Sequence, residues 1–266
     1  MGNNKYCDNR CQLTYRSSAP NNCGIRMSII PRSIFFSHHK CGSTWIDHYL
    51  QKTGSLNQLI YESTHLSRKL PAGNMVLLKN ASYDFARHNR LAGCHVVRNP
   101  LSVLSSAYFS HLRTHPTDGW PELAGQRALL SSVDRTTGMF LTLAFIERAD
   151  FYSGAIGPLY GLRSWDYNDA GFHTLKMEDL VLSPAHFFSQ SFAFMGMEDI
   201  RLPDDRDFAF AKFADAREPG QVAEVSHYRS GNPDDWRNHV PSAVVAYVRL
   251  HFRPLLERWY PEVLAA

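Results

Sequence analysis

The sequence predicts an α/β fold, a single domain with a central, mostly parallel sheet flanked by helices. Short apolar runs typical of buried strands alternate with stretches of helical periodicity along most of the chain. Several of these runs end in a charged residue, as strands do at the ligand-binding edge of such a sheet. The chain has 266 residues and is 44% hydrophobic, so it can bury a core without a metal or disulfide. Strand–helix alternation implies that helices cover both faces of the sheet.

The first 30 residues show no periodicity and are rich in Asn, Ser, Cys and Arg, so we expect a flexible or surface extension. The folded domain is then expected to span residues 31–266. Five cysteines are an odd number and a poor disulfide framework, which favours reduced thiols. Cys7, Cys11 and Cys23 could be metal ligands, but this segment has no histidine and no fourth cysteine. We therefore expect no metal.

The first strand and helix of the domain follow directly. The apolar run Ser33–Ser37 fits a buried strand. Behind the turn after it, apolar positions recur at i, i+3, i+4 and i+7, namely Ile46, Tyr49, Leu50 and Thr53. This spacing predicts a helix, and Gly54 is expected to end it.

Three further apolar runs end in charged groups. Leu59–Tyr61 ends in Glu62, Met75–Leu78 ends in Lys79, and His95–Val97 is followed by Arg98. Asn99 and Pro100 then predict a helix start, as N-cap and first helical residue. Because the carboxyl ends of parallel strands share one edge, these charged groups are expected to surround a ligand.

The second half of the chain continues the alternation of predicted strands and helices. Helical patterning spans residues 131–151, a strand is predicted at Phe172–Met177, a helix opens at Ser183, and Val244–Trp259 gives a last amphipathic helix. Residues 110–165 are a candidate lid or acceptor wall. Its aromatic residues are expected to be core more often than pocket: Trp120, Phe140, Phe145 and Trp165.

The charge pattern excludes some classes of partner. The formal net charge is +3 and no run of Lys and Arg resembles a phosphate-tracking stripe, so nucleic-acid binding is not expected. No window approaches eighteen apolar residues, and the first twenty residues lack the apolar region of a secretory signal. We expect no membrane span and a cytoplasmic protein.

A small-residue turn joins the first strand to the first helix. Cys41-Gly42-Ser43-Thr44 would present backbone N–H groups and the positive end of the helix dipole to a phosphate. Lys40 adds a positive charge before the glycine, whereas a Walker A loop places its lysine after the second glycine. The segment therefore predicts a P-loop-like phosphate site, with an ordinary glycine-containing turn as the alternative.

Three motifs resemble sulfotransferases that use 3′-phosphoadenosine 5′-phosphosulfate (PAPS). Lys40–Trp45 is similar to the family's Lys-Ser-Gly-Thr-Thr-Trp loop, with Cys41 replacing the first Ser. The segment from Val97 to Ser106 resembles the 3′-phosphate motif, in which Arg98 and Ser106 would bind the phosphate. The segment 228–239 is similar to the family's Arg-Lys-Gly and Gly-Asp-Trp-Lys-Asn sequence, and matches it with Arg229, Ser230 in place of Lys, and Gly231.

This resemblance implies a sulfotransferase fold and an enzyme that moves a sulfonyl group from PAPS to a hydroxyl or amine of a small molecule. The product of the donor would be adenosine 3′,5′-bisphosphate (PAP), and PAPS would be consumed as a co-substrate without a metal. Lys40 would stabilise the leaving phosphate, and Cys41, Gly42, Ser43, Thr44 and Trp45 would bind the nucleotide with the residues named above. Met177–Leu180 also resembles a Tyr-Glu-Asp-Leu segment of the family.

The usual catalytic histidine is missing. Lys79-Asn80-Ala81 stands where cytosolic members have Lys-Thr-His. Other members of the family use a glutamate about twenty residues beyond the loop, so Glu62 is the expected general base. His48, one helical turn after Thr44, and His65 are the alternatives. A nucleotide kinase or NTPase and a catalytically inactive nucleotide-binding module remain the competing functions.

Overall fold

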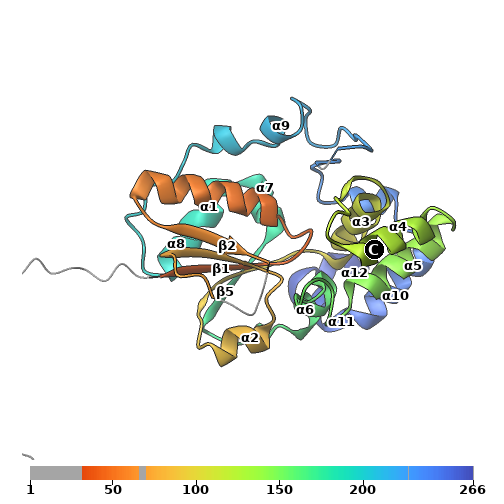
Figure 1. Ribbon diagram of the computed structural model, residues 1–266, viewed down its shortest axis with the longest axis horizontal. Coiled ribbons are helices and arrows are strands. Elements are labelled where there is room, and N and C mark those ends of the chain that lie inside the picture. The colour runs from red at the N-terminus through yellow and green to blue at the C-terminus, as the bar shows by residue number, and fades with distance from the viewer. Residues whose placement is uncertain (1–31, 66–69, 227, 266) are drawn as a thin grey trace, which may run out of the picture. The chain divides into compact units, whose positions relative to one another are not determined.

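A five-stranded sheet forms the centre of the protein (Figure 1). The computed structural model describes residues 32–65, 70–226 and 228–265; the expected extension and its cysteines lie outside these ranges. The strands are β1 (Ser33–Ser37), β2 (Tyr61–Thr64), β3 (Met75–Lys79), β4 (Gly93–Val97) and β5 (Phe172–Lys176), in the order β2-β3-β1-β4-β5. Every neighbouring pair is parallel, which confirms the predicted single α/β domain.

Helices cover both faces of this sheet. Alternate residues of the strands point to opposite sides, so Phe35 and Leu77 share a core with Tyr49 of α1 and Phe188 of α8. The helices of this face are α1 (Ser43–Asn57), α7 (Met177–Leu182) and α8 (Pro184–Phe194). On the other face, Phe36 packs with α2 (Tyr83–His88) and with Trp165. Trp165 directly follows α6 (Pro158–Ser164). In Figure 1, α1 lies above the sheet and α2 below it.

A second group of helices lies beyond the carboxyl ends of the strands, around a separate apolar cluster. It consists of α3 (Pro100–Phe109), the π-helical turn η1 (Ser110–Thr114), α4 (Pro121–Leu130), α5 (Arg135–Ile146), α10 (Ser242–His251), α11 (Arg253–Trp259) and α12 (Pro261–Ala265). Trp120 and Phe145 are buried in this cluster and Phe140 packs against it. Trp165 is buried against the sheet, so three of the four aromatics are core residues as expected, and Phe140 is partly buried at the edge of the core.

Short elements link the sheet to this helical group: η2 (Asp205–Phe208), α9 (Phe210–Phe213) and η3 (Asp235–Asn238). The predicted start of α3 is confirmed, because Asn99 Oδ1 accepts a hydrogen bond from Leu101 N at 3.0 Å and Pro100 is the first helical residue.

Three predicted boundaries are wrong. Helix α1 continues through Gly54 and ends at Asn57, with Gln58 in the left-handed conformation. Gly54 serves packing instead, since a Cβ there would lie 3.2 Å from Leu59 O. The predicted last helix is broken after His251, and Pro254, which lacks an N–H, lies in the first turn of α11.

The third error concerns the second strand. It begins at Tyr61 and ends at Thr64, so it is displaced toward the C-terminus relative to the predicted run Leu59–Tyr61. Glu62 is therefore the second residue of β2 and not the group that follows it. His65 takes the position at the carboxyl end.

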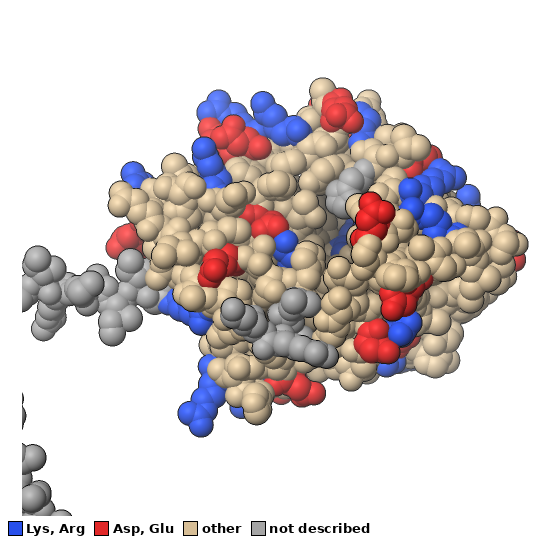
Figure 2. Space-filling view, in the orientation of Figure 1, with Lys and Arg blue, Asp and Glu red and all other residues tan. Residues whose placement is uncertain are grey.

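The surface shows no extended region of one charge on the face drawn in Figure 2, where basic and acidic side chains are interspersed. Of the helices in the described chain, none combines the length and apolar composition needed to cross a bilayer.

Candidate phosphate-binding active site

The turn between β1 and α1 has the geometry of a phosphate-binding loop. Ser37 Oγ donates to Cys41 O at 2.9 Å, and Cys41 N donates to His38 O at 2.9 Å, which closes the turn. Gly42 precedes the first residue of α1 with φ of 75°, and a Cβ there would lie 3.3 Å from Met177 Cγ. Only glycine meets both demands without strain. The free N–H groups of the first turn of α1 are therefore open to an anion.

Asn80 anchors this loop from the end of β3. Its side-chain oxygen accepts from His39 N at 2.5 Å, and its own N–H donates to Ser37 O at 2.8 Å. Asn80 has φ of 62°, in the left-handed region that asparagine tolerates better than most residues. Asn80 thus fixes the backbone of the turn between β1 and α1 on both sides of His38.

Lys40 extends from the loop toward η1. Its Nζ donates to Ser110 Oγ at 2.6 Å, and Arg98 Nη1 donates to the carbonyl oxygen of Lys40. Burial, followed by the positive charge of Arg98, lowers the pKa of Lys40 from its usual 10.5 to about 7. An anion bound here would restore the preference for the charged ammonium group.

Arg98 and the serines of α3 form a second part of the site. Arg98 follows β4, and Ser102, Ser105 and Ser106 lie on the first turns of α3; all four line the same cavity. Arg98 Nε is buried and has no hydrogen-bond partner among the described residues. Since an unpaired buried donor is costly, this arrangement favours an anionic ligand.

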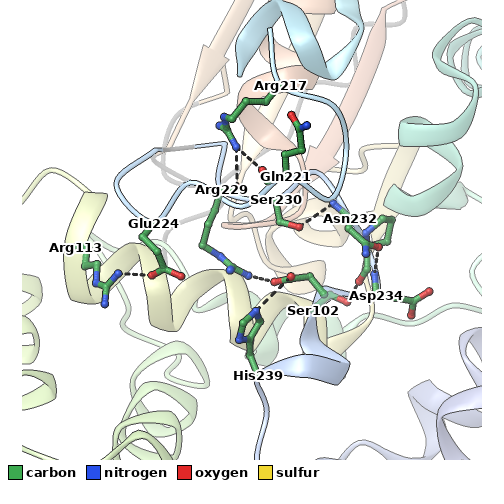
Figure 3. Close-up of polar contacts among 12 residues, drawn as sticks. Ser102, Arg113, Arg217, Gln221, Glu224, Arg229, Ser230, Asn232, Asp234 and His239 are labelled. Atoms are coloured by element: carbon green, nitrogen blue, oxygen red, sulfur yellow. Dashed lines mark hydrogen bonds and ion pairs between the residues drawn. The ribbon is translucent and has the colours of Figure 1, made fainter. Parts of the chain in front are cut away.

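Arg229 supplies a third part from the segment before η3 (Figure 3). Its guanidinium forms an ion pair with Asp235 and lies 4.2 Å from the ring centroid of Phe109. His239 Nε2 lies 3.4 Å from the second oxygen of Asp235. Arg217 holds the backbone of this segment by donating to Arg229 O at 2.9 Å and Tyr228 O at 2.5 Å.

One cavity of about 640 Å³ joins these parts. Of the residues expected to bind the nucleotide, it is lined by Lys40, Gly42, Ser43, Thr44, Trp45, Arg98, Ser106, Arg229, Ser230 and Gly231. Cys41 differs, because its side chain is fully buried in the apolar cluster of the helical group, where burial raises the thiol pKa to about 12. Cys41 can contribute backbone groups to the loop, but its thiol does not line the cavity.

Of the three candidate general bases, Glu62 and His48 lie outside the described lining of this cavity. Glu62 accepts a hydrogen bond from Gly73 N and is absent from the described lining of the cavity. His48 is exposed and stacks on Phe213 at 5.8 Å, in a shallow outer depression with Lys52 and Asp207. The roles of Glu62 and His48 stay predictions. His65, by contrast, lines the cavity.

Other lining residues were not expected as binding or catalytic residues. Ser110 and Thr114 belong to η1 and His115 follows it, at the start of the segment 110–165 that was expected to be a lid or acceptor wall. Glu178 comes from the segment that resembles Tyr-Glu-Asp-Leu. The Glu178 carboxylate accepts from Tyr260 Oη at 2.9 Å and from Asn99 N at 3.3 Å. No sequence pattern marks a π-helical turn, so η1 could not be predicted from the sequence. Within the described ranges, no group of three or more His, Cys, Asp or Glu residues could hold a metal ion.

Comparison with solved structures places this architecture among sulfotransferases. No family model and no curated protein matches the sequence. A mouse sulfotransferase, SULT7A1, solved with PAP, has a TM-score of 0.57 and 14% identity over 86% of both chains. A retinol dehydratase solved with retinol and PAP has a TM-score of 0.52 and 10% identity over 87% of this chain and 83% of that one. The described domain therefore has the sulfotransferase fold, with its five-stranded parallel sheet and flanking helices.

Proposed function

We propose that this protein is a PAPS-dependent sulfotransferase that transfers a sulfonyl group to a hydroxyl or amine of a small-molecule acceptor. One observation carries the proposal: three motifs far apart in sequence, around Lys40, Arg98 and Arg229, line one cavity. Two of these groups would serve the two ends of a bisphosphate. The loop of Lys40 suits the 5′ end because it lies at the N-terminus of α1, and Arg98 with Ser106 suits the 3′-phosphate.

Sulfonyl transfer needs positioning and charge stabilisation more than covalent help from the protein. The acceptor oxygen or nitrogen attacks sulfur as the bond between sulfur and the 5′-phosphate oxygen breaks. The electron pair of that bond leaves with the phosphate, where Lys40 would stabilise the new charge. The hydrogen bond from Lys40 to Ser110 keeps the ammonium group at the cavity wall before the donor arrives.

The acceptor is expected to be a small molecule. A cavity of about 640 Å³ is within the range of ligand pockets in general. The two solved structures with this fold contain PAP, and one of them also contains retinol. These contents describe those proteins, and they support the proposed class of donor and acceptor.

Thermal unfolding with PAP, AMP, or ATP and magnesium tests the nucleotide site. PAP at about one hundred times its dissociation constant should stabilise the protein by about 2.7 kcal/mol, or several degrees. Arg98→Ala should reduce the shift, because the 3′-phosphate loses its charged partner. Arg253→Ala, a change at an exposed arginine of α11, is the matched control and should leave the shift unchanged.

Two results would contradict the proposal. A larger shift with ATP and magnesium than with PAP would favour a kinase or NTPase. A PAP-binding protein that never converts PAPS to PAP would favour the inactive nucleotide-binding module, for which the missing Lys-Thr-His histidine is the sequence observation.

A further inference from the structure

The π-helical turn η1 brings an unassigned histidine to the site. His115 N donates to Ser110 O at 2.8 Å, which is the five-residue spacing of a π-helix. Such single turns are rare and concentrate at functional sites. Ser110 of this turn accepts from Lys40 Nζ, and Thr114 Oγ1 donates to Ser110 Oγ at 3.4 Å. The same turn thus contacts the lysine proposed to act on the leaving phosphate.

Helix α4 holds η1 in place. Arg127 Nε donates to His111 O at 2.7 Å, and Arg127 Nη2 donates to His115 O at 2.5 Å. Gln126 Oε1 lies 2.9 Å from His111 Nδ1. Two side chains of α4 therefore fix both the backbone and one ring of the turn.

The hydrogen bond of the His115 ring fixes its tautomer. His115 Nδ1 lies 3.0 Å from Pro116 O, and a carbonyl oxygen can only accept, so Nδ1 is the donor. The neutral ring then carries its lone pair on Nε2. His115 lines the cavity together with Lys40 and Ser110.

The surroundings of His115 are aromatic and positively charged. Its ring centroid is 5.1 Å from that of His39, 5.3 Å from Trp120 and 6.0 Å from His111. Burial is the largest cause that lowers the pKa of His115 below the usual 6.5. The positive charges that act in the same direction are those of Lys40, Arg127 and His65, and the Pro116 carbonyl opposes them. The ring is therefore neutral at pH 7.

We propose that His115 is the general base of the transfer and takes the acceptor proton on Nε2; this inference rests on the proposed function. As the acceptor oxygen forms its bond to sulfur, its O–H bond breaks and the proton passes to Nε2. The sulfur–oxygen bond to the 5′-phosphate breaks, and its electron pair leaves with the phosphate beside Lys40. The imidazolium then gives the proton to solvent.

In this assignment His115, which follows η1, takes the role of the histidine that is missing after β3. Ala81, where the family's histidine would stand, is buried and has no proton-accepting side chain. Glu62, in β2, accepts a hydrogen bond from Gly73 N. His65 lines the same cavity, so it is the alternative that the experiment must separate from His115.

The rate of sulfonyl transfer is measured as the conversion of PAPS to PAP between pH 5 and 8.5. The acceptors are water and a panel of phenols, aliphatic alcohols and amines. The variants are His115→Gln, His65→Gln and Glu62→Gln, and the exposed His88→Gln is the control. His115→Gln should lower kcat on the order of a hundredfold, because a general base contributes about that much. Its PAP dissociation constant should stay within about twofold of wild type.

The pH profile gives a second readout. Wild-type kcat should rise with pH through a pKa below 6.5 and then level off, whereas His115→Gln should lose this rise. Retention of both the rate and the rise in His115→Gln, with their loss in His65→Gln or Glu62→Gln, would overturn the inference and leave the proposed function intact. A wild-type protein that neither binds PAP nor consumes PAPS would overturn the proposed function itself.

A measurement on the unchanged protein guards against a variant that fails to fold. Nitrogen-15 NMR of labelled histidines, with His115→Gln for assignment, distinguishes the two neutral tautomers. We expect a protonated Nδ1 and an unprotonated Nε2 at pH 7.5. If the signal absent from His115→Gln shows the opposite tautomer, or if the wild-type ring is charged at pH 7.5, His115 is not the base. If His115→Gln does not fold, His115→Asn supplies the assignment of the wild-type signal, and the same two outcomes decide.

Discussion

At the scale of single residues, Lys40 links nucleotide affinity to pH. Its pKa is about 7 in the free protein because of burial and Arg98, and a bound phosphate favours the ammonium form, so binding raises that pKa. Above pH 7 the protein must take up a proton to bind. PAP affinity should therefore fall as the pH rises from 7 to 9, by up to about tenfold per unit. Calorimetric titration in two buffers of different ionisation enthalpy would show the proton uptake.

Lys40→Met supplies the control for this dependence, since methionine is unbranched like lysine, only one atom shorter, and cannot titrate. The variant should bind PAP more weakly at pH 7 and show a flat profile up to pH 9. An equally steep profile in Lys40→Met would mean that another group titrates, and would contradict this interpretation of Lys40.

Single residues also show why part of the site could be predicted and part could not. The position of Gly42, Ser43 and Thr44 at the cavity could be predicted, because a turn that leads into a helix N-terminus is a local pattern. The exact boundaries of β2 depend on pairing with β3, where Glu62 lies opposite Val76. A displacement of the strand along the chain therefore put His65, and not Glu62, at the cavity. Ser110 and His115 depend on the π-helical turn, which tertiary contacts with Arg127 help to fix.

At the scale of elements, Asn80 couples the end of β3 to the phosphate loop. Asn80→Ala removes the acceptor for His39 N and places alanine at φ of 62°, where it is strained by about 1–2 kcal/mol. Loss of the hydrogen bond from His39 N adds about 0.5–1.5 kcal/mol. Urea unfolding should show both losses, and PAP affinity should fall because the loop loses its anchor.

Asn80→Gly separates these two causes. Glycine adopts the left-handed conformation without strain but has no side-chain acceptor, so its unfolding free energy should lie between that of wild type and Asn80→Ala. PAP affinity should be reduced in both variants. Equal stability of Asn80→Ala and wild type would show that Asn80 does not anchor the loop.

Element boundaries illustrate the same division between local and tertiary causes. Asn99 and Pro100 start α3 as predicted, because capping is a local interaction. Gly54 was expected to end α1, but it lies within the helix because the chain passes close to it at Leu59. That close approach is set by the packing of β2 and α1, which no local pattern reveals.

At the scale of the whole molecule, three fully buried histidines connect stability to pH: His38, His95 and His111. His38 and His95 have their Nε2 atoms 3.0 Å apart, and the His95 ring stacks on Trp165 at 3.8 Å. Burial lowers the pKa of all three, that of His38 to about 4. Below pH 6.5 the unfolded chain therefore binds more protons than the folded one, so the free energy of unfolding should fall with pH.

The window between pH 6.5 and 5 isolates this effect, because most carboxylates are ionised throughout it. Each buried histidine should contribute a slope of up to about 1.4 kcal/mol per pH unit. Lys40, with a pKa of about 7 in the folded protein, makes stability depend on pH above this window, so urea unfolding at pH 6.5, 6 and 5 measures the slope of the histidines. His95→Phe keeps the ring against Trp165 but removes a titrating group, so its slope should be shallower, while the exposed His88→Gln should keep that of wild type. A stability that is flat from pH 6.5 to 5 would mean that these rings are protonated in the folded protein, and would contradict the neutral packing of His38 against His95.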